Sequence, residues 1–292
     1  MTTPFHKPIF ETTEIQGVQL FLNPPVDFKT EWIGQDALKR QLLAAWLKVD
    51  AEDLPLTPRL IGKPGIGKTT LAFSCAKLLN ENCWIYQCTM DTRPEDLLIT
   101  PVISAEGKIK YHASPLVTAM IHGGVCILDE GNRMSEKSWA SLAPLLDHRR
   151  YIESIVAGIT VYAHPDFRTC VTVNEDASTY EIPEYIDSRL QPIIEVGFPG
   201  AEDEYRIIKY NLPFAPDDLV RQIVTFLQAG HDEDRPYTVR DGVNIGRYAL
   251  KLGVMHQRSH NEYINQAIRQ VIDQDALDFK VQSEQQAGKF DG

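Results

Sequence analysis

The segment GKPGIGKT at residues 62–69 restricts the fold of this chain more than any other feature of the sequence. It follows a short apolar run at residues 59–61 and precedes an apolar helical pattern over residues 69–79, so it joins a strand to a helix. Glycines let such a loop curl until its backbone N–H groups point inward, and the helix adds its positive N-terminus. The spacing GxxxxGK[ST] therefore predicts a loop that binds phosphate groups.

Two side chains at the end of this loop add further chemistry. Lys68 is placed to reach the β- and γ-phosphate oxygens, and the Thr69 hydroxyl is placed to ligate Mg²⁺. A dedicated GTPase carries an NKxD-type guanine motif, and the stretch VNED at residues 173–176 is not one, so ATP is the expected nucleotide. The residues of the loop predicted to bind it are Gly62, Pro64, Gly65, Ile66, Gly67, Lys68, Thr69 and Thr70.

An acidic pair, Asp129 and Glu130, follows the apolar run VCIL. The run predicts a buried strand, and ligands of doubly wound sheets bind at the carboxyl ends of the strands. Asp129 would hold Mg²⁺ through its water, so Thr69 and Asp129 form the predicted metal site. Glu130 is the candidate to orient and deprotonate the attacking water, because a carboxylate beside the metal's aspartate can reach the γ-phosphate. Without the phosphate loop upstream, this acidic pair would be a weak signal.

The remaining apolar runs define the fold class. Five short strands separated by helices predict an α/β fold, a parallel sheet covered by helices on both faces. They lie at residues 59–61, 83–88, 125–129, 169–174 and 192–198. After the Pro199-Gly200 turn the pattern becomes helical, which predicts a small all-helical domain. Its four expected helices lie at residues 201–212, 216–228, 239–252 and 262–272.

These patterns divide the chain into four parts. Residues 1–30 form an N-terminal segment, 31–200 the nucleotide-binding core, 201–282 the helical lid domain and 283–292 a loose polar tail.

Composition excludes several classes of protein. The net charge of -11, from 29 basic and 40 acidic residues, argues against a surface built for phosphate backbones, so a nucleic acid is not an expected partner. The five cysteines lack CxxC or Cys/His metal spacing, which indicates reduced thiols in a cytoplasmic protein. No apolar stretch approaches the ~20 residues that span a bilayer, so no membrane span is expected.

The order of the motifs resembles that of an AAA+ ATPase from residue 33 to residue 252. The stretches that carry this resemblance are GKPGIGKTT, GGVCILDEGNRM, TVNED, IDSRL and TVRDG. The MoxR branch of AAA+ proteins fits best. The pieces DHRR and AHPDF are most similar to the subgroup that contains the Q subunit of rubisco activase, the nitric oxide reductase activation ATPase and the gas vesicle ATPase.

The resemblance implies roles for residues outside the first two motifs. Asn174 would be the sensor that positions the lytic water, although a residue that caps a strand end is an alternative. Arg240 would be sensor 2, which ties the lid to the nucleotide phosphates, although a solvated helix residue would look the same. Ile33 and Gly34 fall where the family cradles the adenine, and apolar packing alone would explain them equally well.

Arg189 stands where the family places its arginine finger, which enters the site of the neighbouring subunit. An ordinary surface ion pair is the alternative. The family usually has Phe after this arginine and the chain has Leu190, so Arg149 and Arg150 remain rivals for the contact in trans. A further departure is Gly131, where the branch usually carries an apolar residue, and we expect a looser turn there.

Two insertions, at residues 103–112 and 151–162, line one face or the pore of the ring in MoxR proteins. Lys108, Lys110 and Tyr111 would then touch a client, although solvated loops have the same sequence character. The resemblance implies a hexameric ring that remodels or activates a client protein or inserts a cofactor, with a separate von Willebrand A domain protein as partner. A nucleic-acid-associated AAA+ motor and a slow ATP-binding regulatory switch are the alternatives.

Overall fold

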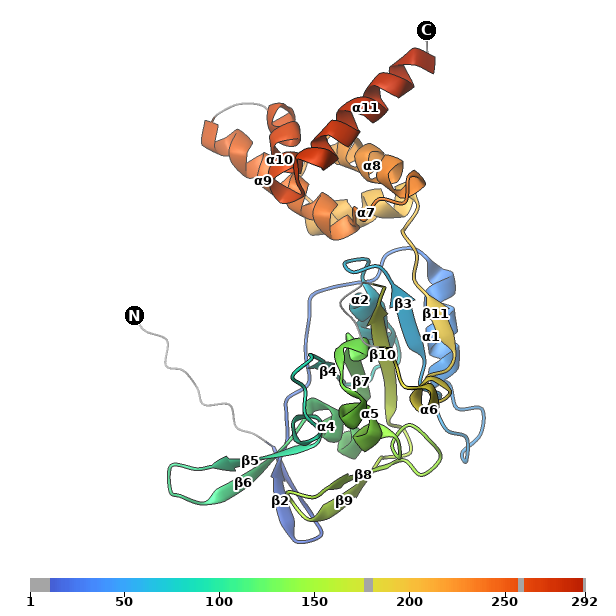
Figure 1. Ribbon diagram of the computed structural model, residues 1–292, viewed down its shortest axis with the longest axis vertical. Coiled ribbons are helices and arrows are strands. Elements are labelled where there is room, and N and C mark those ends of the chain that lie inside the picture. Colours follow the sequence, from blue (N-terminus) through green and yellow to red (C-terminus); the bar gives the residue numbers. More distant parts are fainter. Residues whose placement is uncertain (1–10, 176–180, 257–259, 291–292) are drawn as a thin grey trace. The chain divides into compact units, whose positions relative to one another are not determined.

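The computed structural model describes residues 11–175, 181–256 and 260–290 (Figure 1). These residues divide into two compact units. The sheet unit contains the residues up to 32, residues 36–62 and residues 67–196, and the helical unit contains residues 33–35, 63–66 and those from 197 onward.

The sheet unit is built on the five-stranded parallel sheet that the apolar runs predict. Its strand order is β11-β3-β10-β7-β4. The strands are β3 (Arg59–Gly62), β4 (Cys83–Gln87), β7 (Val125–Asp129), β10 (Arg168–Asn174) and β11 (Ile193–Glu195). The backbone register aligns Asn174 with Gly62 and Gln87 with Asp129, so the carboxyl ends of the strands meet at one edge of the sheet.

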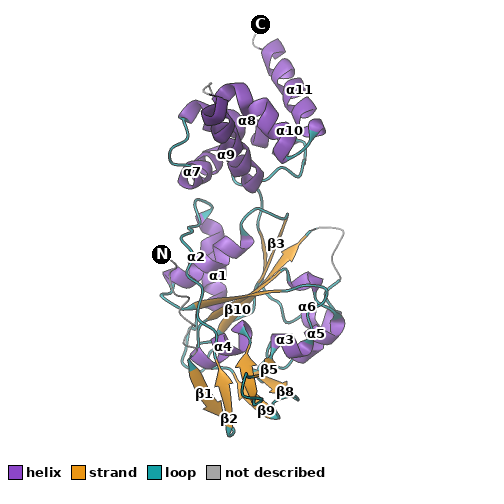
Figure 2. Ribbon diagram, turned by 90° about the vertical axis from the view of Figure 1, so that its left-hand side faces the viewer, coloured by secondary structure: helices purple, strands orange, loops and turns teal. Residues whose placement is uncertain are grey.

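Helices cover both faces of this sheet. Figure 2 shows α1 and α2 on one side and α5 and α6 on the other. The helices of the unit are α1 (Asp36–Trp46), α2 (Lys68–Leu78), α3 (Pro94–Leu97), α4 (Pro115–His122), α5 (Glu136–Leu142) and α6 (Glu184–Asp187), with a 3₁₀ turn η1 (Gly131–Arg133). Strand β7 has four fully buried residues, which is the burial that a continuous apolar run requires.

A second sheet combines two distant parts of the chain. Its order is β1-β2-β6-β5, from β1 (Thr12–Ile15), β2 (Val18–Phe21), β5 (Ile99–Ile103) and β6 (Ile109–Ala113). The insertion at residues 103–112 lies within the antiparallel hairpin of β5 and β6. Its parallel pairing with the N-terminal segment, which aligns Leu20 with Tyr111, is not visible in local sequence. The insertion at residues 151–162 forms a second hairpin, from β8 (Tyr151–Ser154) and β9 (Ile159–Tyr162).

All five cysteines are buried and free. Burial raises the pKa of each thiol, to about 12 for Cys75 and Cys83 and above that range for the other three. Cys126 and Cys170 lie in the neighbouring central strands β7 and β10. The prediction of unpaired interior thiols is confirmed.

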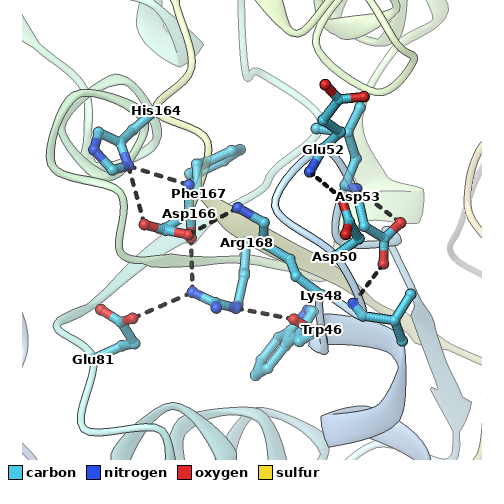
Figure 3. Close-up of polar contacts among 12 residues, drawn as sticks. Trp46, Lys48, Asp50, Glu52, Asp53, Glu81, His164, Asp166, Phe167 and Arg168 are labelled. Carbon is cyan, nitrogen blue, oxygen red and sulfur yellow. Dashed lines mark hydrogen bonds and ion pairs between the residues drawn. The ribbon is translucent and has the colours of Figure 1, made fainter.

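The amino end of β10 is held by a cluster of polar contacts around Arg168 (Figure 3). Its guanidinium donates to the backbone carbonyls of Trp46 (3.1 Å) and Asp166 (2.8 Å) and to the Glu81 carboxylate (3.2 Å). Lys48 completes the cluster through an ion pair of 3.2 Å with the Asp166 side chain. These contacts fasten the end of α1 and the loop after α2 to the first residue of β10.

The helical unit contains the four expected helices and one more. They are α7 (Ala201–Asn211), α8 (Asp217–Asp232), α9 (Val239–His256), α10 (Ile264–Val271) and α11 (Gln274–Phe290), with a 3₁₀ turn η2 (His260–Tyr263). The prediction of a loose polar tail from residue 283 is wrong as far as Phe290, because α11 continues to that residue. The stretch SEQQAGKF is polar, but Glu, Gln, Ala and Lys are good helix formers, so polarity does not end the helix. Within the described residues, no helix is long and apolar enough to cross a membrane.

Candidate active site

The phosphate loop begins and ends in the sheet unit. Gly67 has φ 100° and caps the N-terminus of α2, where its carbonyl accepts a 2.9 Å hydrogen bond from the Leu71 N–H. This left-handed conformation strains residues that carry a Cβ, which is why glycine is required there. Lys68 is 5% exposed, and its ammonium donates to the Gly62 carbonyl at 2.8 Å. Thr69 and Thr70 follow in the first turn of α2 and are half-buried.

The middle of the loop, residues 63–66, belongs to the helical unit. Gly65 has φ 84°, and a methyl group on it would lie 3.0 Å from the Thr238 Oγ1 atom, so the loop backbone passes close to this threonine. Ile66 is buried and Pro64 is exposed. Lys63 forms a 2.6 Å ion pair with Asp234.

Asp129 ends β7 and accepts two hydroxyl hydrogen bonds on one oxygen. The Thr69 hydroxyl donates to its Oδ1 atom at 2.6 Å, and the Thr172 hydroxyl donates to the same atom at 2.7 Å. The predicted metal ligands Thr69 and Asp129 therefore lie in direct contact. Carboxylate and hydroxyl oxygens are the ligands that Mg²⁺ prefers, so this pair fits the role expected of it.

Glu130 has a special backbone conformation and two hydrogen bonds on its carboxylate. It adopts the left-handed region, with φ 55° and ψ 45°, and its N–H donates to the Thr172 Oγ1 atom at 2.8 Å. Its Oε1 atom accepts from the Asn174 Nδ2 atom at 3.0 Å, and its Oε2 atom accepts from the Arg133 Nε atom at 2.6 Å. A non-glycine residue in this region is strained, and such residues concentrate at functional sites.

Asn174 is fixed through its backbone as well. The Asn132 side chain donates to the Asn174 carbonyl at 2.8 Å, and its oxygen accepts from the Asn174 N–H at 3.3 Å. The predicted residues Thr69, Asp129, Glu130 and Asn174 are thus connected by hydrogen bonds at the carboxyl edge of the sheet.

Sequence reasoning missed three residues of this network, Thr172, Asn132 and Arg133. Thr172 has a usable signal, because it precedes Asn174 by two positions on a strand and therefore points to the same face. Arg133 follows Glu130 by three positions, a spacing that brings side chains together in a helical turn. Asn132 has no such signal, because its partner is the backbone of a distant strand.

The expectation of a looser turn at Gly131 is wrong. The residue is buried, and a methyl group on it would lie 2.4 Å from Val171 Cγ1 and 3.3 Å from the Trp139 ring. The turn after Glu130 packs tightly against β10 and α5, and a side chain at this position would have to displace both neighbours.

The three candidate arginines for a contact in trans differ in their surroundings. Arg150 is committed to the fold, because its guanidinium donates to the carbonyls of Phe167 (2.7 Å) and His164 (3.3 Å), and burial lowers its pKa. Arg149 is exposed and makes a bidentate pair with Asp147, whose pKa falls to about 2 because this arginine donates to it. Arg189 lies 3.5 Å from the same carboxylate and donates to the Tyr185 carbonyl.

The candidate residues of the helical unit lie on two short segments. Gly34, with φ 74°, stands beside Asp203 in the first turn of α7, and Asp203 also accepts from the Gln35 N–H at 3.2 Å. Ile33 precedes this contact. Arg240 is exposed on the first turn of α9, whose start is capped by Thr238. Their assignment to adenine and phosphate remains a prediction, as does the client contact of the exposed Lys108 and Lys110 and the half-buried Tyr111.

The class of protein follows from the fold and this site. Residues 59–190 match the AAA domain family of the dynein-related subfamily. The strand order, the phosphate loop and the acidic strand end agree with that match, so this part of the chain has an AAA+ fold.

Its relatives identify the branch. The chain is 31% identical over 115 residues to Protein CbbQ of Hydrogenophilus thermoluteolus, covering 39% of this chain and 43% of that protein. It is 30% identical over 151 residues to the denitrification regulatory protein NirQ of Pseudomonas aeruginosa, covering 51% of this chain and 57% of that protein. The resemblance to the MoxR branch is thereby confirmed.

Two further similarities are more distant. The von Willebrand factor A domain-containing protein 8 of Mus musculus is 25% identical over 238 residues, which are 74% of this chain and 12% of that protein. The chain therefore covers less than two thirds of each of these three relatives. The structure of the Thermotoga maritima RuvB Holliday junction branch migration motor matches with a TM-score of 0.55 and 17% identity, over 83% of this chain and 73% of that chain. This likeness shows the fold alone.

Proposed function

We propose that the chain hydrolyses ATP in a hexameric ring, where the energy serves to remodel or activate a client protein or to insert a cofactor. The observation that carries the proposal is the hydrogen-bonded group of Thr69, Asp129, Glu130 and Asn174 at the carboxyl edge of the sheet. This group combines a metal-binding pair with a base and a residue that orients it. A regulatory protein that only binds ATP would not need the last two.

Each residue has a role in the proposed reaction. Lys68 and the N–H groups of the loop would bind the phosphates, and Thr69 and Asp129 would hold Mg²⁺, which would neutralise negative charge on the phosphates. Glu130 orients a water molecule and accepts its proton, and Asn174 keeps the Glu130 carboxylate in place through the 3.0 Å hydrogen bond.

The contact between subunits is assigned to Arg189, with Arg149 as its rival. Both lie at the Asp147 carboxylate, so the subunit presents two guanidinium groups at one place. Arg150 is not proposed for this role, because its guanidinium is bound to two backbone carbonyls.

The proposed partners are a von Willebrand A domain protein and a client protein complex. Support comes from the similarity to a protein named for its von Willebrand factor A domain and from the similarity to NirQ, which is named as a denitrification regulatory protein. A cytoplasmic location belongs to the same proposal, and the five unpaired buried thiols support it.

Steady-state phosphate release tests the activity, and the Glu130→Gln variant is its matched control. The parent should release phosphate, and the variant should bind ATP and release almost none. Crosslinking of the ATP-loaded variant in native lysate, followed by mass spectrometry, should identify a von Willebrand A domain protein with its client. A parent that binds ATP without turnover would favour the regulatory switch.

The second candidate function is a nucleic-acid-associated motor. The fold shared with RuvB does not decide between the two functions, and the net charge of -11 opposes a nucleic-acid partner. Stimulation of the ATPase rate by DNA, lost on addition of salt, would establish this alternative.

A further inference from the structure

Arg133 makes a short contact with the Glu130 carboxylate. Its Nε atom lies 2.6 Å from Glu130 Oε2, which is the distance of a strong charge-assisted hydrogen bond. The two side chains are 24% and 32% exposed, so water weakens this ion pair less than it would weaken one on the open surface. The contact therefore restrains the carboxylate that we propose as the base.

The two oxygens of Glu130 are held by residues from two separate parts of the chain. Arg133, in the turn after the residue, binds Oε2, and Asn174, at the end of β10, binds Oε1. Ordering a free glutamate side chain costs rotamer entropy, and the two contacts provide that order before a water molecule binds. Two partners on the two oxygens define the plane of the carboxylate as well as its location.

The turn that carries Arg133 is itself rigid. The Arg133 backbone N–H donates to the Glu130 carbonyl at 3.0 Å. Gly131 packs against Val171 and Trp139, and Asn132 is bound to the backbone of Asn174 at both its N–H and its carbonyl. The donor to Oε2 is thus positioned by the same packed turn that forces Glu130 into the left-handed conformation.

A carboxylate held in this way can still act as a base. Each carboxylate oxygen has two lone pairs, and each oxygen of Glu130 accepts one of these two hydrogen bonds. A lone pair on each oxygen is therefore available for a water proton, and its direction is fixed in advance. Pre-organised groups lower the reorganisation that the transition state requires.

We propose that Arg133 is a positioning residue for ATP hydrolysis, which fixes the orientation of the Glu130 carboxylate together with Asn174. The inference rests on the proposed ATPase function. It concerns turnover and not nucleotide binding, because Arg133 acts on the Glu130 carboxylate, which we propose as the base.

The test compares Arg133→Ala and Arg133→Lys in the full chain. The alanine variant should lower kcat by about tenfold to a hundredfold with little change in the KM for ATP. Lysine retains the charge and an N–H donor, so it should recover activity several-fold over alanine. Lys39→Ala is the matched control, because Lys39 and Asp36 form a 2.6 Å ion pair at the same i,i+3 spacing on α1. Its kcat should equal that of the parent.

Further measurements separate positioning from folding. Arg133→Ala should keep the melting temperature and the ATP affinity of the parent, and its loss should be less than additive with that of Asn174→Ala, because both act on one carboxylate. An alanine variant with parental or higher kcat would overturn the inference, as would a loss confined to KM or a lysine variant as inactive as alanine. A parent without turnover would instead refute the proposed ATPase function.

Discussion

The two ends of strand β10 are both rich in polar contacts, yet they have different chemistry. At the amino end the Arg168 guanidinium donates to backbone carbonyls and to a carboxylate, so its donors are matched by acceptors (Figure 3). At the carboxyl end two carboxylates and two hydroxyls meet, and Asp129 Oδ1 alone accepts two hydrogen bonds. Oxygen lone pairs exceed donors there, which is the condition that favours a cation.

The number of hydrogen bonds therefore does not distinguish a functional cluster from a structural one. The balance of donors and acceptors does, together with strain, since Glu130 at the carboxyl end has a left-handed backbone. Substitutions at the amino end should change stability without changing turnover. Substitutions at the carboxyl end should do the reverse.

The largest effect is expected for Glu130→Gln. Loss of a general base lowers kcat by about 100- to 10,000-fold, while the neutral amide keeps the size of the side chain. The melting temperature should stay within a few degrees, and phosphate release with parallel thermal melts measures both quantities. Glu81→Gln, the carboxylate at the other end of β10, is the matched control and should retain the parental kcat. A large loss of kcat in the control would contradict the proposed difference between the two ends of β10.

Arg168→Ala should give the largest change in stability. Removal of the guanidinium leaves two carbonyls and the Glu81 carboxylate without this donor, at a cost of about 2–4 kcal/mol. Urea unfolding should report this decrease in the free energy of unfolding. The kcat measured well below the melting temperature should equal that of the parent. A stable protein with impaired kcat would mean that the two ends of the strand are coupled.

Thr172→Val should combine both effects at smaller size. Its hydroxyl accepts from the Glu130 N–H and donates to Asp129, so valine leaves a part-buried donor unpaired at a cost of about 1–3 kcal/mol. We expect kcat to fall by about tenfold, because Glu130, whose backbone is strained, loses the hydrogen-bond acceptor of its N–H group. Thr172→Ser, which keeps the hydroxyl, should restore most of the activity. Equal losses in the serine and valine variants would contradict this reasoning.

Glu204 in the helical unit provides a third, smaller case, a buried carboxylate that has no ionic partner among the described residues. Within the same residues its Oε1 atom has no hydrogen bond, its Oε2 atom accepts from Gln228 at 2.8 Å, and burial raises its pKa to about 7 from 4.5. Between these two pH values the folded state binds more protons than the unfolded state, so this group lowers stability as the pH rises from 4.5 to 7.

Glu204→Gln should remove that dependence, which is on the order of 1–3 kcal/mol. The measurement is the difference in unfolding free energy between parent and variant at pH 5 and pH 8. Taking the difference removes the contribution of His231, whose pKa burial lowers and which acts in the opposite direction. A difference that does not vary with pH would show that Glu204 stays ionised in the folded chain.

Local sequence was sufficient for the parallel sheet and for the first residues of the site. Apolar runs and a glycine loop are local signals, so the strands at Arg59, Val125 and Arg168 and the residues Lys68, Thr69 and Asp129 could be predicted from them. The joining of β2 to β6 could not, because it pairs segments about ninety residues apart in the chain. Neither could the tight packing at Gly131 or the commitment of Arg150 to two backbone carbonyls, since both depend on neighbours that only the folded chain provides.

Because all five thiols are buried, their reaction with an alkylating reagent can report local unfolding of the protein. Alkylating reagents react with the thiolate form of cysteine. Burial and a raised pKa keep the thiolate fraction of these cysteines low in the folded chain. Alkylation of Cys126 or Cys170 therefore requires strands β7 and β10 to separate, whereas Cys75 needs only a displacement of α2. The order in which mass spectrometry detects these labels would show which part of the sheet unit opens first, without any substitution.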